Sequence, residues 1–334
     1  MQKSMWEWAR VRAIGGVAAA ALSLGLVGCG GGGGDDAPVF GVNVSVDGVA
    51  DTANPLTAGE SSEIDVPSGA TLTFASEGET RWDPVATGSS YLVNGFSYTA
   101  KSMTVTSMAG GSLVVVFANK ANDNEKATLT VHVAPQEFQH VARAEGEVET
   151  WAESTVRTDG TSFESGFLYR TVLLGDAGYG VDVGDPDSGV YYTRSLYDPQ
   201  DRYLGYVVPD TGYGCAYDNP VVQVSYPLQV GKTWTGSAHR DCPSKPSSNF
   251  DLSYARAVEA YERITVPEGS HDALRIRSEL SYSNLGYDPE GGYTVTTTCW
   301  WAVDLGRNVK CEYIIHYADG LSSTQSAVLT QFAH

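Results

Sequence analysis

The residue types that carry out catalysis are present in this chain, but their spacing matches no familiar catalytic motif. The sequence contains no Gly-x-Ser-x-Gly, no His-Glu-x-x-His and no glycine-rich phosphate loop opening a helix. The histidines are scattered singly, at His132, His140, His239, His271, His316 and His334. A distant serine, histidine and aspartate could still converge in the fold, so a hydrolase stays open as an alternative. We expect a protein that is not an enzyme and uses no cofactor.

Two Asp-x-Gly segments look like catalytic motifs. Asp187-Ser188-Gly189 and Asp210-Thr211-Gly212 imitate the paired motifs of aspartic proteases. That chemistry needs one carboxylate from each of two large lobes, and these motifs are too close in sequence to belong to two lobes. We therefore predict a turn at each place.

The carboxylates of Asp182, Asp185 and Asp187 are the best metal candidate in the sequence. Their oxygens could converge on calcium in a turn, but the spacing lacks the Asp-x-Asp-x-Asp-Gly pattern and the bidentate glutamate of an EF-hand. An acidic loop bounded by proline and glycine is the commoner structure, so we assign no metal ion.

Four cysteines, Cys215, Cys242, Cys299 and Cys311, can form two disulfides. Folding residues 294–303 against residues 308–317 about the turn at 304–307 brings Cys299 opposite Cys311. A second hairpin, 221–226 with 232–238, places Cys215 and Cys242 just beyond its open end. We therefore predict Cys215–Cys242 and Cys299–Cys311. Zinc is the rival interpretation, but no two of these cysteines have ligand spacing and no histidine joins them.

Three tryptophans, Trp234, Trp300 and Trp301, are candidates for the wall of a ligand cleft. Trp300 and Trp301 are adjacent in one predicted strand, so their side chains point to opposite faces. One of them should pack in the core, and the other should face outward or into a cleft. A purely structural role for both tryptophans is the alternative interpretation.

The N-terminal residues have the layout of an export signal. Lys3, Arg10 and Arg12 precede an apolar run at residues 13–28, which is too short for a comfortable transmembrane helix. Residues 26–29, Leu-Val-Gly-Cys, resemble the lipobox of bacterial lipoprotein precursors, in which the cysteine is lipidated. The resemblance implies a signal peptide at 1–28, membrane attachment through acylated Cys29 and a flexible Gly/Asp tether at 29–38. Because Gly30 follows the cysteine, it also points to the outer membrane. An uncleaved membrane anchor is the alternative.

The charge balance limits the partners. The chain has 21 lysines and arginines against 40 aspartates and glutamates, a formal net charge of −19. Such a surface repels the phosphates of nucleic acids and anionic lipid headgroups. We therefore expect no nucleic-acid partner.

The body of the chain is predicted to be all-β, in two domains. Residues 39–134 contain short runs that alternate apolar with polar residues, which favours an antiparallel sandwich. This segment resembles a bacterial immunoglobulin-like domain, whose last strand typically reads like residues 128–133. Residues 135–334 again read as strands and contain all but two of the 19 tyrosines.

Part of the second domain resembles a group of exported bacterial proteins of unknown function. The resemblance rests on YPLQVGKTW at 226–234, ITVPEG at 264–269, DALRI at 272–276 and WWAVDLGRNVK at 300–310. His271 departs from the pattern, because the group usually has an aromatic residue there. The group looks like the half-barrel lipoprotein carriers, so the resemblance implies a curved antiparallel sheet, or half-barrel, with a concave apolar face.

These observations predict a non-catalytic envelope lipoprotein of the outer membrane that binds an unknown apolar ligand, glycan or envelope protein. A surface adhesin or glycan-binding protein is the second hypothesis, and a secreted hydrolase is the third. A cleft lined by leucine and valine would favour the apolar ligand, whereas tyrosines beside carboxylates would favour a glycan. A serine, cysteine or aspartate beside a histidine in a pocket would favour the hydrolase.

Overall fold

The computed structural model describes residues 40–50, 56–77, 80–87, 91–97, 102–287, 291–318 and 320–333. The predicted signal peptide, Cys29 and the tether lie outside the described residues. Within the described part, no helix is long and apolar enough to cross a membrane. The described structure is all-β, with two short 3-10 turns, η1 (Gly175–Ala177) and η2 (Pro246–Ser248).

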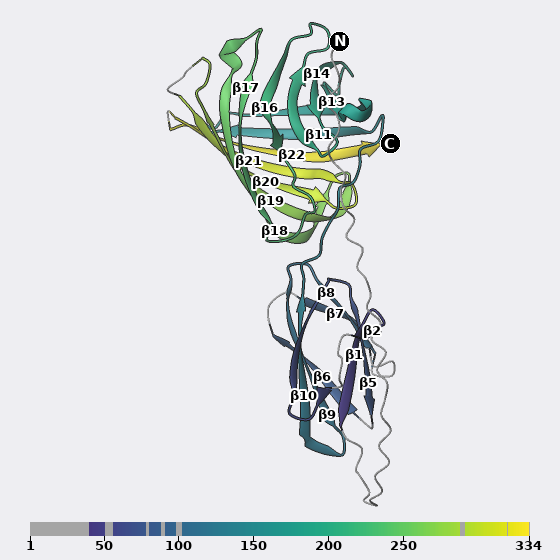
Figure 1. Cartoon of the computed structure of the whole chain (residues 1–334). Coiled ribbons are helices and arrows are strands. Elements are labelled where there is room, and N and C mark those ends of the chain that lie inside the picture. Colours follow the sequence, from purple (N-terminus) through teal and green to yellow (C-terminus); the bar gives the residue numbers. More distant parts are fainter. Residues whose placement is uncertain are drawn as a thin grey trace, which may run out of the picture. The chain divides into compact units, whose positions relative to one another are not determined.

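The described residues up to 133 form two sheets. One has the order β2-β1-β5-β8-β7 with β3 on β1, and the other has the order β4-β10-β9-β6 (Figure 1). The strands are β1 (Gly41–Val46), β2 (Val49–Ala50), β3 (Leu56–Thr57), β4 (Ser61–Val66), β5 (Thr71–Glu77), β6 (Thr80–Thr87), β7 (Tyr91–Ser97), β8 (Ser102–Ser107), β9 (Gly111–Asn119) and β10 (Asn122–Val133).

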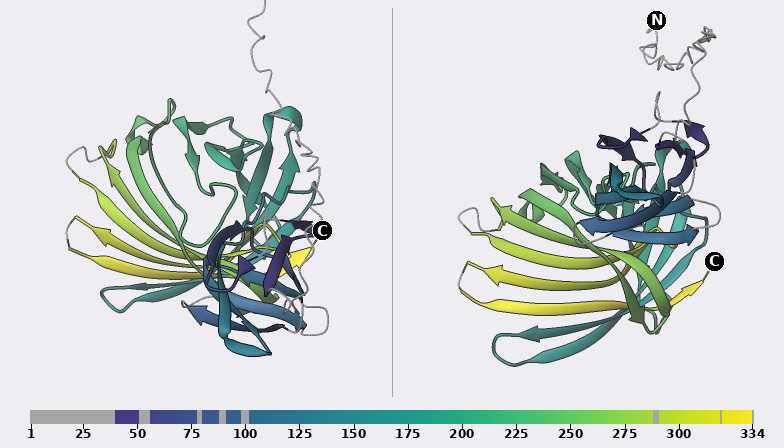
Figure 2. Two further views of the ribbon diagram at one scale, coloured as in Figure 1. Left: turned by 60° about the horizontal axis from the view of Figure 1, so that its bottom comes forward. Right: turned by 90° about the horizontal axis from the view of Figure 1, so that it is seen from below.

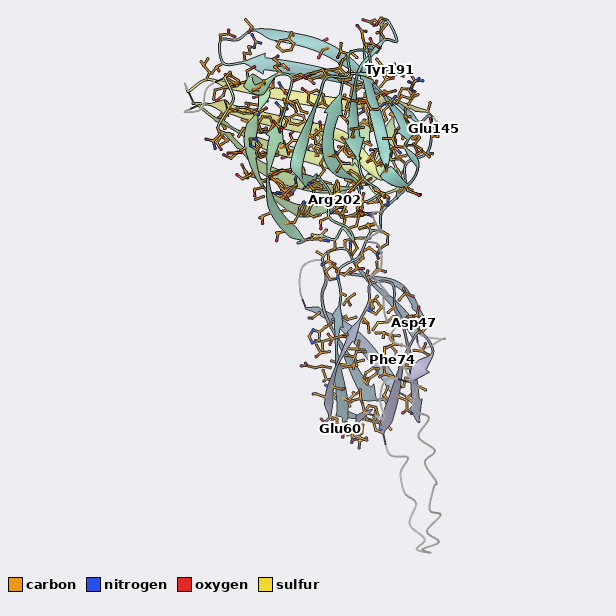
Figure 3. All side chains as sticks on the ribbon, turned by 45° about the horizontal axis from the view of Figure 1, so that its top comes forward. Asp47, Glu60, Phe74, Glu145, Tyr191 and Arg202 are labelled. Atoms are coloured by element: carbon orange, nitrogen blue, oxygen red, sulfur yellow. A yellow bond between two sulfur atoms is a disulfide. The ribbon has the colours of Figure 1, made fainter. Side chains whose placement is uncertain are left out.

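Strand alternation builds one core between these two sheets. In β10, Leu129, Val131 and Val133 are buried while their neighbours are partly exposed. They share a cluster with residues of the other sheet, including Phe74, whose ring lies 5.1 Å from that of Phe117 (Figure 3). The immunoglobulin-like character of this domain stays a prediction.

One pairing differs from the expected antiparallel arrangement. β4 runs parallel to β10, with Ser61 opposite Thr128 and Val66 opposite Val133. Parallel neighbours need a long connection, and here the chain between β4 and β10 forms the strands from β5 to β9. The sequence pattern predicted the alternation of apolar and polar residues in each strand, but it did not predict which neighbouring strands run parallel.

The second part of the chain is a closed antiparallel barrel and not the half-barrel that we expected. Its strands follow one another in sequence order, and β11 pairs with β22 from Val148–Ala333 to Arg157–Ser323. The strands are β11 (Val148–Arg157), β12 (Ser162–Leu173), β13 (Tyr179–Gly184), β14 (Tyr191–Tyr197), β15 (Arg202–Val207), β16 (Gly214–Val222), β17 (Thr233–Asp241), β18 (Phe250–Val266), β19 (Gly269–Ser283), β20 (Tyr293–Ala302), β21 (Arg307–Tyr317) and β22 (Ser322–Ala333).

The strands from β18 to β22 form one strongly curved wall of this barrel (Figure 2). Two register shifts lie in this wall, between Val258 and Ala260 and between Trp300 and Trp301. Such bulges increase local bending and twist, which helps long strands to close. Residues 254–263 lie within strand β18.

The weakest ladder of the barrel is the seam between β16 and β17. Only two residue pairs face each other there, Ala216 with Asp241 and Tyr217 with Arg240. The predicted hairpin had its first strand at 221–226. In the structure this strand, β16, lies earlier in the chain and ends at Val222. Residues beyond that point leave the sheet, and Leu228 instead exchanges two backbone hydrogen bonds of 2.8 Å with Phe138.

Side chains replace the missing ladder bonds at the seam. The Val222 amide donates to the Tyr254 hydroxyl at 3.1 Å, and the Val222 carbonyl accepts from the Trp234 indole at 3.0 Å. Tyr254 reaches across Gly236, where a Cβ atom would lie 2.3 Å from the tyrosine oxygen. Glycine is therefore required at 236, and the Val222 backbone groups are satisfied by side chains instead of a partner residue on β17.

Both predicted disulfides are present. Cys299 lies directly opposite Cys311 in the β20–β21 ladder. Cys215 and Cys242 continue the short β16–β17 register by one position, and their bond covalently closes the seam.

We predict that the two disulfides differ in their contribution to stability. Removing either bond should cost about 2–4 kcal/mol through the entropy of the unfolded chain. The Cys215→Ala/Cys242→Ala variant should lose more than the Cys299→Ala/Cys311→Ala variant, because its closed segment is longer and its ladder is shorter. Urea denaturation of both double variants measures this difference. A larger loss in the Cys299/Cys311 variant would contradict the assignment of the seam as the weak point.

Candidate functional site

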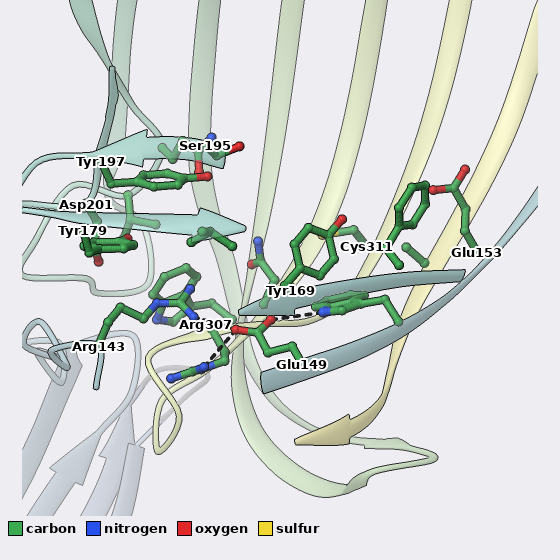
Figure 4. Close-up of a pocket in the computed structure, with 18 of the residues that line it drawn as sticks. Arg143, Glu149, Glu153, Tyr169, Tyr179, Ser195, Tyr197, Asp201, Arg307 and Cys311 are labelled. Atoms are coloured by element: carbon green, nitrogen blue, oxygen red, sulfur yellow. Dashed lines mark hydrogen bonds and ion pairs between the residues drawn. The ribbon is translucent and has the colours of Figure 1, made fainter. Parts of the chain in front are cut away.

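Polar and aromatic side chains of the barrel surround a cavity of about 460 Å³ (Figure 4). Its lining comes from strands that are far apart in sequence, notably β11, β12, β14 and β21. The lining residues are Arg143, Glu149, Trp151, Glu153, Phe167, Tyr169, Tyr179, Val181, Ser195, Tyr197, Asp201, Gln223, Val224, Trp301, Arg307, Asn308, Cys311, Tyr313, Gln325 and Ala327. We call this space the barrel cavity.

Aromatic rings dominate the wall of the barrel cavity. The rings of Tyr179 and Tyr197 are stacked at 5.0 Å, and Trp151 meets Tyr169 edge-on at 6.4 Å. The aliphatic members of the lining are few, namely Val181, Val224 and Ala327. The cavity therefore offers ring faces and polar edges more than a continuous aliphatic surface.

An ion network lies at one end of the barrel cavity. Glu149 accepts hydrogen bonds from Arg143 at 2.6 Å, from Arg307 at 2.8 Å and from the Trp151 indole at 3.0 Å. Arg307 also donates to Glu147 at 2.9 Å, and the side chains of Arg307 and Glu147 are each only 3% exposed. The network joins β11 to the start of β21 and the segment before β11.

Within this network, Glu149 and Arg143 stay ionised in spite of burial. Burial alone would raise the pKa of the Glu149 carboxyl, but Arg143 and Arg307 hold it below its ordinary value. Burial disfavours the Arg143 cation, yet Glu149 raises the pKa of that guanidinium above its usual range. Each charge in this network therefore lies beside an opposite charge.

Asp201 forms a second polar centre at the cavity wall. It lies in the turn between β14 and β15, and its φ of 60° is in the left-handed region that aspartate tolerates. Its carboxylate accepts hydrogen bonds from Tyr179 at 2.9 Å and from Tyr226 at 3.1 Å, and it lies 3.1 Å from the His140 ring. Burial first and Asp201 second raise the pKa of the Tyr226 hydroxyl, so this donor stays protonated.

Other polar side chains line the wall outside the ion network and the Asp201 centre. Glu153 accepts a 3.3 Å hydrogen bond from Thr155 and makes no ion pair with a described residue. Burial, and then the charge of Glu153, raise the pKa of Tyr313 to about 12. Gln223, Asn308 and Gln325 add amide or carbonyl groups to the lining. These groups could bind hydroxyls of a ligand.

The three predicted wall tryptophans separate in the structure. Trp301 is buried, lines the barrel cavity and has its ring 6.3 Å from that of Tyr226. Trp300 points to the opposite face, where it donates to Glu262 at 2.7 Å and lies 4.6 Å from the Lys310 amine. Trp234 does not line this cavity and belongs to the seam.

The three aspartates of the predicted acidic loop, Asp182, Asp185 and Asp187, do not converge on one site. Asp182 is buried on β13 between Arg170 and Arg194, at 2.7 and 2.6 Å, and these hydrogen bonds hold the pKa of the carboxyl down although burial opposes this. Asp185 instead accepts from the backbone amide of Asp187 at 2.7 Å, which is a turn interaction. No cluster of three or more potential metal ligands occurs among the described residues.

Two serine–histidine contacts bear on the hydrolase hypothesis. Ser112 lies 2.8 Å from His132, and His132 lies 3.6 Å from Glu63, but the His132 and Glu63 side chains are 41% and 75% exposed. The hollow beside His132 does not include Ser112 among its lining residues. His316 and Ser322 make a similar exposed contact at 2.9 Å. Neither pair has the enclosed setting that an activated nucleophile needs.

Sequence reasoning missed the charged groups that organise the barrel cavity, Arg143, Glu149, Asp201 and Arg307. Arg307 was assigned to a turn and Asp201 was not singled out. Glu149, Trp151 and Glu153 occupy alternate positions of β11, a strand that the sequence analysis did not predict, and this alternation is a detectable signal. The contact between Glu149 on β11 and Arg307 on β21 reaches across β22, so predicting it needs the barrel topology.

Comparison with known proteins yields only distant structural likenesses. No protein family and no curated protein matches the chain. The solved structures that align with it include a protein described as exported, with a YmcC-like fold, from Bacteroides fragilis. It shows 15% identity and a TM-score of 0.37 over 60% of this chain and 100% of that chain.

A lipoprotein from Parabacteroides distasonis aligns at 13% identity and a TM-score of 0.33, over 59% of this chain and 100% of that chain. The hypothetical lipoprotein YmcC from Escherichia coli aligns at 10% identity and a TM-score of 0.31, over 58% of this chain and 92% of that chain. These scores are too low to carry an argument about this chain.

We predict an acid-sensitive contribution of Glu149 to stability. Its folded pKa is below the ordinary 4.5, so its stabilisation is complete above that pH and is lost as the pH falls toward the folded value. Glu149→Gln should lower the free energy of unfolding at pH 7 by about 3 kcal/mol, since two buried guanidiniums lose a shared partner. It should also flatten the decline in stability below pH 4.5, as measured by denaturant titration across pH.

Glu312→Gln is the matched control. This carboxylate pairs with Lys310 at 2.7 Å but is half exposed, so its loss should cost less than about 1 kcal/mol. Parallel stability curves of Glu149→Gln and the wild type in acid would refute the role assigned to the network.

Proposed function

We propose that this chain is a non-catalytic binding protein of the cell envelope, and that its barrel cavity binds a small ligand. The observation that carries the proposal is the cavity itself, about 460 Å³ in volume and bordered by both aromatic rings and polar side chains. This volume falls within the usual range for small-molecule sites, and ring faces with a few polar groups are the usual composition of such sites.

The wall favours a ligand with hydroxylated rings, such as a mono- or disaccharide, over an aliphatic lipid. Trp151, Tyr169 and Trp301 offer ring faces, while Glu153 and Gln325 offer hydrogen-bonding groups beside them. Sugar rings use both kinds of surface, because their C–H faces are apolar and their edges carry hydroxyls. A fatty acyl chain would need a longer aliphatic lining than three small side chains provide.

The serine–histidine contacts are exposed, which supports a role without catalysis, whereas Asp201, which lines the barrel cavity 3.1 Å from the His140 ring, keeps the hydrolase as the alternative. The polar groups at the ionic end of the cavity are also poor candidates for acid–base chemistry. Glu149 is held ionised by two arginines and is already fully engaged, so it is not poised to exchange a proton near neutral pH.

The location that we propose is the outer membrane, with attachment through acylated Cys29. The support is the sequence alone: three basic residues, an apolar run and the Leu-Val-Gly-Cys segment before the polyglycine stretch. A diacylglyceryl group on the cysteine would bury enough methylenes to make attachment lasting. The tether would leave the β-domains in the aqueous phase.

A fluorescence titration tests the proposed site. In the Cys29→Ser full-length protein, mono- and disaccharides should change the tryptophan emission, because Trp151 and Trp301 line the barrel cavity. Trp301→Phe should weaken the binding of the best sugar about tenfold, in line with the loss of a buried stacking surface. Trp300→Phe changes the neighbouring residue on the opposite face and should leave affinity unchanged.

The competing ligand class is read in the same experiment. Binding of palmitate with no response to sugars would show an apolar carrier and contradict the ligand class proposed here. Equal losses of sugar affinity in Trp301→Phe and Trp300→Phe would contradict the placement of the site in the barrel cavity.

A further inference from the structure

A second cavity, of about 580 Å³, lies beside the segment that follows β17. It shares no lining residue with the barrel cavity. Its lining consists of Tyr217, Arg240, Lys245, Ser247, Ser248, Asn249, Phe250, Tyr282, Leu285, Tyr287 and Tyr293. We call this space the cationic cavity, because its only charged lining residues among the described part of the chain are Arg240 and Lys245.

Neither cation is neutralised by an ion pair with a described residue. Arg240 directs Nε and Nη2 to the Ser248 carbonyl, at 3.0 and 2.6 Å, and its guanidinium carbon lies 3.9 Å from the centre of the Phe250 ring. A carbonyl and a ring face orient the guanidinium but leave its full charge. Two such cations in one hollow are unusual in a chain whose net charge is −19.

Aromatic rings form much of the remaining wall, together with Ser247, Ser248, Asn249 and Leu285. Tyr282 and Tyr293 are stacked with their centres 4.4 Å apart, and Phe250 meets Tyr282 edge-on at 5.1 Å. Tyr217 meets Phe250 in the same manner at 6.2 Å. Burial raises the pKa of the Tyr217 and Tyr293 hydroxyls, so these groups stay protonated and can donate hydrogen bonds.

The segment 242–249, which contributes four residues to the lining of the cationic cavity, is held in place by the rest of the barrel. The segment 242–249 begins at Cys242, which is joined to Cys215, and the Cys242 amide donates to the Asn249 side chain at 2.8 Å. Arg240 donates two hydrogen bonds to the Ser248 carbonyl and so fixes the end of this segment. A site built in advance loses less entropy on binding than one that must form around its ligand.

We propose that the cationic cavity binds a small planar aromatic anion, with a carboxylate, sulfonate or phosphate near Arg240 and Lys245 and the ring against the tyrosines. An anion gains charge-assisted hydrogen bonds from the guanidinium and the ammonium. A cationic ligand would use the same rings but would meet two positive charges. Charges farther than about 8–10 Å are screened at physiological salt, so the nearby groups decide. These are Arg240 and Lys245 in the lining and Asp241 behind it, whose carboxylate accepts a 3.2 Å hydrogen bond from the Asn249 side chain.

Calorimetric titration with 2-naphthalenesulfonate tests this site, with 2-naphthol as the uncharged probe of the same ring size. The full-length Cys29→Ser protein should bind the sulfonate at least about tenfold more tightly than the naphthol. Lys245→Gln should weaken binding of the sulfonate several-fold and leave binding of the naphthol unchanged. Lys245 is exposed, so this substitution does not threaten folding. Arg240→Gln should weaken binding of the sulfonate by about tenfold or more.

Two control variants separate this site from binding elsewhere on the protein. Lys310→Gln removes the same charge on the outer face of the barrel and should not alter affinity. Trp301→Phe alters the barrel cavity and should not alter affinity either. Equal binding of sulfonate and naphthol, an equal effect of Lys245→Gln and Lys310→Gln, or loss of binding in Trp301→Phe would each overturn the proposal. None of these results depends on whether the barrel cavity binds a sugar.

Discussion

The backbone ladder between β11 and β22 turns a curved sheet into a closed barrel, and the barrel cavity depends on this closure. It gives the strands an inside, where Glu149 and Trp151 of β11 meet Arg307 and Cys311 of β21. The barrel has one place where few backbone pairs join neighbouring strands, the β16–β17 seam. There a disulfide and two side-chain hydrogen bonds to Val222 stand in for the absent ladder.

The interior is divided by chemistry. On the seam side, Phe250, Leu252 and Tyr254 pack into an apolar cluster with neighbouring rings. Elsewhere, buried ion pairs and tyrosine hydroxyls border open space, which keeps the barrel cavity polar at its edges. An interior filled by aliphatic side chains would be more stable, so a cavity lined in this way is most simply explained by a ligand. The cationic cavity has a separate wall, in which the charged residues are Arg240 and Lys245.

The sequence predicted the features that depend on local pattern. Alternation along single strands gave the all-β class, and symmetry about the 304–307 turn gave Cys299–Cys311. The separation of Trp300 and Trp301 followed from the period of a strand. Closure, the parallel β4–β10 pair and the Glu149–Arg307 contact join segments far apart in the chain, and nothing in a single sequence records such register. The half-barrel expectation failed for that reason.

Mass spectrometry of the protein purified from its native envelope tests the central claim most directly. We expect a chain that begins at an acylated Cys29 and releases, on denaturation, about one small hydroxylated compound per molecule. A chain that retains residues 1–28, or that releases only aliphatic lipid from the barrel cavity, would contradict the proposed anchor or the proposed ligand class.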